Sequence, residues 1–146
     1  MKTYVQVAAG PFELLVDAAM VHEVAGRTAG ADAGVAGVWW EWRGQTLPVV
    51  GGRRLLGLAD ATGGGPAAGL VLESGGVGTD GGDALLAVLE VDAVRRLLRL
   101  DEARFAALPP LPAPVRRLFD GLYLDPDTRT VAYRLRPDLD LSARDP

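Results

Sequence analysis

One stretch in the middle of the chain decides the fold, and it runs Gly37-Val38-Trp39-Trp40-Glu41-Trp42-Arg43-Gly44-Gln45-Thr46-Leu47-Pro48-Val49-Val50. Its first part, Val38–Trp42, consists mainly of β-branched and aromatic residues, which favour strands. Arg43-Gly44-Gln45 supplies a turn and Thr46–Val50 returns as a second strand, so the stretch predicts a β-hairpin. Pro48 has no N–H group to donate to a ladder, which predicts that the second strand is an edge strand or is bulged there.

Similar signals precede this stretch. Around Gly10-Pro11, the runs Tyr4–Ala8 and Phe12–Val16 predict two antiparallel strands. Asp17 is placed to cap a short helical turn, because its side chain can accept a hydrogen bond from a free backbone N–H. Met20–Val24 then predicts another strand. The first half of the chain is therefore expected to be made of short strands and tight turns.

The remainder of the chain predicts the same kinds of element. Arg53–Gly57 predicts one helical turn closed by glycine. Asp101–Leu108 predicts a short helix with acidic residues at its favourable N-terminal end, and a proline-rich link, Pro109–Pro114, follows it. The other predicted strands are Leu70–Glu73, Ala84–Val91, Arg96–Leu100, Gly121–Leu124 and Arg129–Leu135.

The two halves of the chain resemble each other. Val16-Asp17-Ala18 and the strand after it match Val91-Asp92-Ala93 and the strand after that, and each half continues with a glycine and a hairpin. We therefore predict a single domain over residues 1–146, built from two small β-barrels of similar plan that share one core. The glycine-rich segment Asp60–Pro66 is the expected connector. Chance similarity in a chain rich in Ala, Leu, Val, Arg and Gly is the alternative explanation.

Composition excludes several classes of protein. Of 146 residues, 49% are hydrophobic and 23% are charged, which is typical of a globular domain and not of a disordered chain. The absence of cysteine excludes disulfides and thiol catalysis. A net charge of −4 argues against nucleic acid as a partner. No apolar run approaches the roughly 18 residues that suggest a membrane span, so no membrane insertion is expected and the cytoplasm is the expected location.

Few residues are suited to catalysis. His22 is the sole histidine, and Ser74 and Ser142 are the only serines. The motif Gly76-Val77-Gly78-Thr79-Asp80-Gly81 has the spacing of a dinucleotide-binding loop, but Asp80 and the nearby Asp83 place negative charge where a pyrophosphate would bind. We expect no catalytic residue, metal or cofactor. A small-ligand barrel, or a minor hydrolase that uses His22 with a nearby acid, remains the alternative from another class.

The three tryptophans allow two interpretations. Neighbouring strand residues face opposite sides, so Trp40 and Trp42 share one face and Trp39 lies on the other. One face belongs to the core. The other either forms an aromatic surface of the kind that is common at protein interfaces, or is covered by the partner barrel.

The stretch Gly37–Val50, together with Arg53–Gly57, resembles the CheW-like domain of chemotaxis coupling proteins, whose members carry a sequence similar to G-V-x-N-L-R-G-x-x-x-P-V-V-D-L-R. The resemblance continues in order along almost the whole chain. Phe12–Gly26 is similar to the second strand, short helix and Glu-Val strand of the family, and Val88–Leu100 is similar to its L-V-D-x-V…V-L-x-L segment. The ordered set is more specific than any single motif.

The resemblance implies an all-β fold with a few short helices, arranged as two intertwined five-stranded SH3-like β-barrels. It also implies a non-enzymatic chemosensory adaptor. Proteins of this family bind the regulatory domain of a CheA-type histidine kinase and the cytoplasmic tip of a methyl-accepting chemoreceptor, and they bridge both into a signalling array. The expected partners are therefore proteins, and the expected location is the cytoplasm, where the protein clusters with membrane receptor arrays.

The resemblance also places seven residues at the protein-binding surface: Val21, Glu23, Val24, Arg43, Gly44, Val88 and Val91. Arg43 and Gly44 match the Arg-Gly turn of the family, whose arginine helps to order the receptor-facing region. The first three match a strand beside the interaction surface. The two valines of the second half match the receptor-groove segment.

Two pairs of residues depart from the family pattern. Glu41-Trp42 replaces Asn-Leu before the Arg-Gly turn, and Gly51-Gly52 replaces Asp-Leu before the short helix. These departures support an alternative in which the protein is a partner-restricted paralogue. Such a paralogue binds only the kinase or only the receptor, in a pathway other than chemotaxis.

Overall fold

The computed structural model describes residues 1–26, 39–58, 68–74 and 85–137, and most of them form strands. The strands are β1 (Lys2–Ala9), β2 (Phe12–Asp17), β3 (Val21–Gly26), β4 (Trp39–Trp42), β5 (Gln45–Gly51), β6 (Ala68–Ser74), β7 (Leu85–Val91), β8 (Ala93–Leu100), β9 (Phe119–Leu124) and β10 (Val131–Leu135). Short helices lie at α1 (Gly52–Leu55) and α2 (Ala113–Arg116), with 3-10 turns at η1 (Ala18–Met20) and η3 (Glu102–Arg104). The expected loop 27–34, connector 60–66, motif 76–81 and Ser142 lie outside the described residues.

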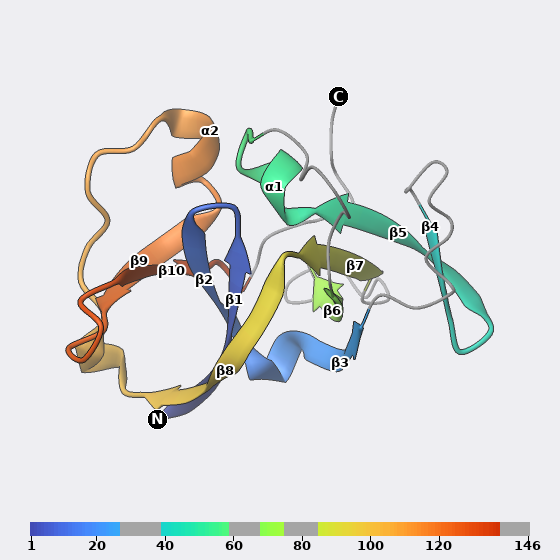
Figure 1. Ribbon diagram of the computed structural model, residues 1–146, viewed down its shortest axis with the longest axis horizontal. Coiled ribbons are helices and arrows are strands. Elements are labelled where there is room, and N and C mark those ends of the chain that lie inside the picture. Colours follow the sequence, from blue (N-terminus) through green and yellow to red (C-terminus); the bar gives the residue numbers. More distant parts are fainter. Residues whose placement is uncertain (27–38, 59–67, 75–84, 138–146) are drawn as a thin grey trace, which may run out of the picture.

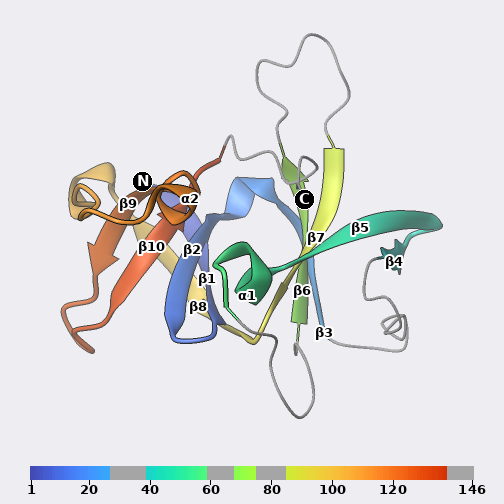
Figure 2. The same cartoon turned by 90° about the horizontal axis from the view of Figure 1, so that it is seen from above.

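The strands form two five-stranded sheets that follow one plan (Figures 1 and 2). The first sheet has the order β8-β1-β2-β10-β9 and the second has the order β3-β6-β7-β5-β4. Each is centred on an antiparallel pair, β1–β2 or β6–β7, and the second strand of that pair lies parallel to a strand from a further hairpin. This correspondence confirms the predicted all-β fold of two intertwined SH3-like units.

The sheets do not coincide with the two halves of the sequence. Strands from both ends of the chain build the first sheet, and the second is built from β3 to β7. In the described order of elements, the chain passes between the sheets at η1 and again at Asp92. The strands before and after residues 60–66, β5 and β6, belong to the same sheet.

The buried side chains of the described residues form three groups. The largest lies between the two sheets and takes Val7 and Leu14 from one and Leu70 and Leu89 from the other. Each sheet also has a smaller buried group on its other face, which we call its inner face. In the first sheet this group surrounds Leu15, and in the second it includes Val71 and Val88, the chain neighbours of Leu70 and Leu89. Adjacent strand residues point to opposite faces, and both faces here are covered, which explains the unbroken apolar runs of β6 and β7.

The predicted helix over Asp101–Leu108 is wrong, because only the single turn η3 forms. The chain becomes extended again at Phe105, whose ring packs edge-on against Tyr4 with 5.4 Å between ring centroids. Ala106 then exchanges two backbone hydrogen bonds with Leu122 of β9, at 2.8 and 3.0 Å. This bridge joins the segment that follows β8 and η3 to the opposite edge of the first sheet. Neither sheet is closed by a continuous ladder among the described strands.

Two further expectations need correction. The proline-rich link Pro109–Pro114 runs into α2, which begins at Ala113 and has Pro114 in its first turn, where the missing N–H is not needed. Strand β5 lies between β7 and β4 and is not an edge strand. However, β4 pairs with Gln45–Pro48 and β7 pairs with Val49–Gly51. Pro48 therefore ends the stretch that pairs with β4, before pairing with β7 begins.

Candidate functional site

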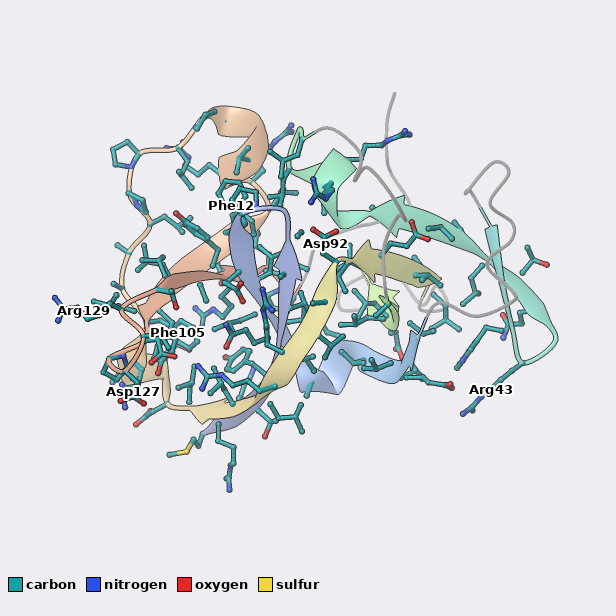
Figure 3. The ribbon with its side chains drawn as sticks, viewed as in Figure 1. Phe12, Arg43, Asp92, Phe105, Asp127 and Arg129 are labelled. Carbon is teal, nitrogen blue, oxygen red and sulfur yellow. The ribbon has the colours of Figure 1, made fainter. Side chains whose placement is uncertain are left out.

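A cluster of polar and aromatic side chains joins β3 and β4, which are the two edge strands of the second sheet. We call the region where these two strands meet the outer end of the sheet. Trp42 Nε1–H donates a hydrogen bond to Glu23 Oε1 at 2.9 Å. Arg43 Nη2 donates to the same oxygen at 3.4 Å. Figure 3 shows Arg43 at the far end of this sheet, away from Asp127 and Arg129, which lie between β9 and β10. We call Glu23, Trp42 and Arg43 the outer cluster.

The turn between β4 and β5 positions Arg43. Arg43 and Gly44 both have positive φ values, 48° and 78°, as the two central residues of a type I′ hairpin turn require. Glycine adopts this conformation without steric cost, whereas arginine rarely does. The turn leaves the Arg43 side chain 70% exposed directly after Trp42. The predicted hairpin and its turn are confirmed.

Two more side chains extend the outer cluster along the sheet. The His22 ring meets the Trp42 ring nearly edge-on, with centroids 6.1 Å apart. His22 Nε2 lies 2.7 Å from Glu73 Oε1, across the paired strands β3 and β6. His22 is exposed and Val21 packs against the shared core, as the alternation of β3 predicts. The acid required by the hydrolase alternative is thus present, on an exposed strand surface.

Trp42 also packs inward. Its ring contacts the buried group on the inner face of the second sheet, which includes Leu47, Val71 and Val88. This places one tryptophan partly in the core and partly at the outer cluster. The side chains of Trp39 and Trp40 lie outside the described part of the structure.

The seven predicted site residues fall into two groups. Glu23, Arg43 and Gly44 meet at the outer cluster, with Val24 45% exposed nearby on β3 and Val21 partly buried beneath that strand. Val88 and Val91 are 0% and 1% exposed and belong to the cores. Their side chains cannot touch a partner in this conformation, so any role at an interface is to support the exposed residues from below.

Exposed apolar residues on β8 were missed by the sequence analysis. Val94 is 37% and Leu97 is 67% exposed. They pair with Val7 and Val5 of β1 around a register shift, so both face the side of the sheet that carries the shared core. The shift separates them by three positions, which hides them from a search for strict alternation. A similar exposed pair, Leu124 and Val131, lies at the β9–β10 hairpin.

The carboxylates at the two crossings between sheets have structural partners. Asp17 accepts a hydrogen bond from the Ala19 N–H at 2.9 Å, which confirms the predicted cap. Asp92 accepts from the Gly10 N–H at 2.7 Å and from Arg53 Nε at 3.1 Å. Hydrogen bonding from Arg53 lowers the pKa of Asp92, with a further contribution from Gly10.

A second polar cluster lies beneath the first sheet. Arg134 donates to Asp120 at 2.6 Å and to Glu102 at 2.9 Å, and its guanidinium lies over the Phe105 ring. Arg134 and its two carboxylate partners, together with Lys2 and Tyr4, line a small open pocket. The hydrogen bonds from Arg134 lower the pKa of Glu102. The charges are paired within the pocket wall, so the arrangement indicates a structural network.

The described residues form neither a metal site nor a membrane-spanning helix. No three His, Asp or Glu side chains there are grouped as metal ligands. None of the helices in the same part of the chain is long and apolar enough to cross a bilayer.

Comparison with known proteins gives a consistent result. The family model described as CheW-like domain matches residues 3–138. The crystal structure of the scaffolding protein TtCheW from Thermoanaerobacter tengcongensis superposes with a TM-score of 0.68 at 19% sequence identity, covering 92% of this chain and 88% of that one. At this identity, the superposition supports the fold alone. No curated protein matches the chain.

Proposed function

Because this chain belongs to the CheW-like domain family, we propose that it is a non-enzymatic adaptor that couples chemoreceptors to a CheA-type histidine kinase in a signalling array. The family match over residues 3–138 carries this proposal. The proposed partners are the regulatory domain of the kinase and the cytoplasmic tip of a methyl-accepting chemoreceptor. Binding to both would place the protein in the cytoplasm beside membrane receptor arrays.

The proposed binding surface combines apolar and charged side chains. On the second sheet it includes Val24, Glu23 and Arg43, and on the first it includes Val94 and Leu97 of β8. Protein interfaces commonly combine an apolar centre with a polar rim. Val24 beside the outer cluster fits that composition. The other predicted site residues are assigned to the same surface as its supporting framework, and these are Val21, Gly44, Val88 and Val91.

Charge reversal provides the first test. Arg43→Glu and Glu23→Lys should each weaken binding to a CheA-type regulatory domain or a receptor tip by about tenfold or more. Each change replaces the attraction between positions 23 and 43 by a repulsion between like charges and reverses one charge that is presented to the partner. Isothermal titration calorimetry with both partners from the same genome measures the effect. Arg116→Glu on α2, at the other end of the molecule (Figure 1), is the matched control and should bind normally. Wild-type protein that binds neither partner would contradict the proposal.

The second candidate is a partner-restricted paralogue. Gly52 supports it, because a Cβ at this position would lie only 2.8 Å from the carbonyl oxygen of Glu90. The start of α1 therefore lies too close to β7 to leave room for the leucine that is usual at this position of the family pattern. Binding to the kinase without the receptor, or the reverse, would favour this candidate. Binding to both at once would exclude it.

The alternative from another class is a minor hydrolase that uses the His22–Glu73 pair. The 2.7 Å contact between the two side chains is the observation that keeps it open. Screening the purified protein against ester and phosphoester substrates tests it. Turnover that is lost in His22→Ala and retained in Gln6→Ala would favour the enzyme.

A further inference from the structure

Trp42 contacts three side chains at the outer end of the second sheet: His22, Glu23 and Arg43. Its Nε1–H donates to Glu23 at 2.9 Å, and the Arg43 guanidinium carbon lies 4.8 Å from its ring centroid. The His22 ring meets it edge-on at 6.1 Å. Glu23 and His22 belong to β3, whereas Trp42 ends β4. The indole therefore connects the two outermost strands of this sheet.

Of the two contacts made by Glu23, the one with Trp42 is the stronger. The Arg43 contact is 3.4 Å long and its guanidinium is largely exposed, so solvent screens it and side-chain entropy opposes it. The indole N–H donates to a carboxylate at 2.9 Å from a partly buried position. A hydrogen bond to a charged acceptor is shorter and stronger than a neutral one.

The direction of the Arg43 side chain depends on the same indole. Its guanidinium lies over the face of Trp42, where the ring attracts a cation. The Trp42 side chain itself packs against the buried group formed by Leu47, Val71 and Val88. Arg43 is thus oriented by a fixed aromatic surface as well as by the charge of Glu23.

The two sheets differ at this place in their common plan. In the first sheet, backbone hydrogen bonds between Ala106 and Leu122 join the outer parts of the sheet. In the second, the described residues show no backbone hydrogen bond between β3 and β4. Among those residues, the side-chain contact between Glu23 and Trp42 makes the corresponding connection.

We infer that Trp42 is a positioning residue, whose indole fastens Glu23 to β4 and orients the guanidinium of Arg43 toward the partner. The inference rests on the proposed function for the identity of the partner. The contact on which it depends is present in the free protein and can be measured there.

The first experiment needs no partner. With three tryptophans, the ¹H–¹⁵N spectrum should show three indole N–H resonances, and Trp42→Phe identifies one by its loss. Glu23→Gln should move the Trp42 resonance more than the other two. Glu13→Gln is the matched control, because Glu13 contacts Gln6 and Arg95 in the first sheet, and it should leave that resonance in place. A Trp42 resonance that does not move in Glu23→Gln overturns the inference.

The second experiment asks whether Trp42 acts through Arg43. Trp42→Phe keeps an aromatic ring but removes the N–H donor. It should weaken binding to the kinase regulatory domain or receptor tip about tenfold with Arg43 present, and less than about twofold in the Arg43→Ala background. Equal losses in both backgrounds, or no loss in either, overturn the inference. Urea midpoints of the same variants separate these effects from loss of folding.

The two proposals fail in different ways. Wild-type protein that binds neither partner contradicts the proposed function, while the indole resonance still decides whether Trp42 holds Glu23. Normal coupling of both partners by Trp42→Phe supports the proposed function and contradicts the positioning role.

Discussion

At Gly52, the backbone of α1 lies so close to β7 that a side chain has no space. A Cβ there would lie 2.8 Å from the Glu90 oxygen and 3.3 Å from Ala9 Cβ, whereas at Gly51 the nearest atom would be 3.7 Å away. Gly52→Ala should therefore lower the free energy of unfolding by about 1–3 kcal/mol, because a core that is already packed must shift. Urea denaturation measures the loss.

Gly51→Ala is the matched control for this substitution, and it should change stability by no more than about 0.5 kcal/mol. If both variants are equally stable, α1 can move away from β7 at no cost. The close approach would then not explain the departure from the family pattern.

Single residues were predictable where the signal was local. Asp17 as a cap and Arg43-Gly44 as a turn each depend on neighbours within a few positions. The hydrogen bond from the Trp42 indole to the Glu23 carboxylate was not predictable, because these residues are 19 positions apart and belong to strands that do not pair. Only the curvature of the whole sheet brings them together.

At the scale of elements, Asp92 ties three segments together. It stands between β7 and β8 and binds the β1–β2 turn at Gly10 and α1 at Arg53, and Figure 3 shows it between the two sheets. Asp92→Asn keeps the size of the side chain and removes its charge. We expect this change to lower the free energy of unfolding by about 1–2 kcal/mol at neutral pH, since hydrogen bonds to charged groups are stronger than neutral ones.

The pH dependence of this loss follows from the lowered pKa of Asp92. The folded state holds that pKa below the unfolded value of 3.8, so the stabilisation is complete above that value and disappears as pH falls through the folded pKa. The difference between wild type and Asp92→Asn should therefore shrink in acid. Asp101→Asn, whose carboxylate makes no capping hydrogen bond, is the matched control and should change the free energy of unfolding at neutral pH by no more than about 0.5 kcal/mol. A constant difference would contradict the assignment.

Periodicity predicted most strands and failed where tertiary contacts overrode it. The helical pattern of 101–108 stops at Phe105, because its ring packs on Tyr4 and Ala106 pairs with Leu122. In β7, both faces are buried, which agrees with its apolar run, whereas the family resemblance had placed Val88 and Val91 at the binding surface. In β8, the register shift interrupts the alternation of side chains, so the sequence pattern did not show that Val94 and Leu97 lie on the same face.

At the scale of the molecule, the repeat predicted two units of one plan but not how they interleave. Similar segments mark similar strands, and these were recognisable in the sequence. Which sheet each strand joins depends on pairings between β1 and β8 and between β2 and β10, which are more than 80 positions apart. The sequence contains no local signal for such distant pairings.

The shared core predicts that both sheets unfold together. All three tryptophans lie in β4 of the second sheet, and all three tyrosines, Tyr4, Tyr123 and Tyr133, lie in the first. Tryptophan fluorescence and fluorine NMR of fluorotyrosine-labelled protein therefore report on different sheets. Their urea midpoints should coincide, as expected for one cooperative unit. Two separate midpoints would show that the sheets fold independently.

The double passage of the chain between the sheets also has a mechanical consequence. The described elements are joined across the interface at η1 and at Asp92, and both points are anchored by carboxylate hydrogen bonds. A force that pulls the sheets apart is divided between two covalent segments in parallel, instead of stretching one linker. A load applied to one sheet is therefore transmitted to the other as a rigid displacement, with little hinge motion between them.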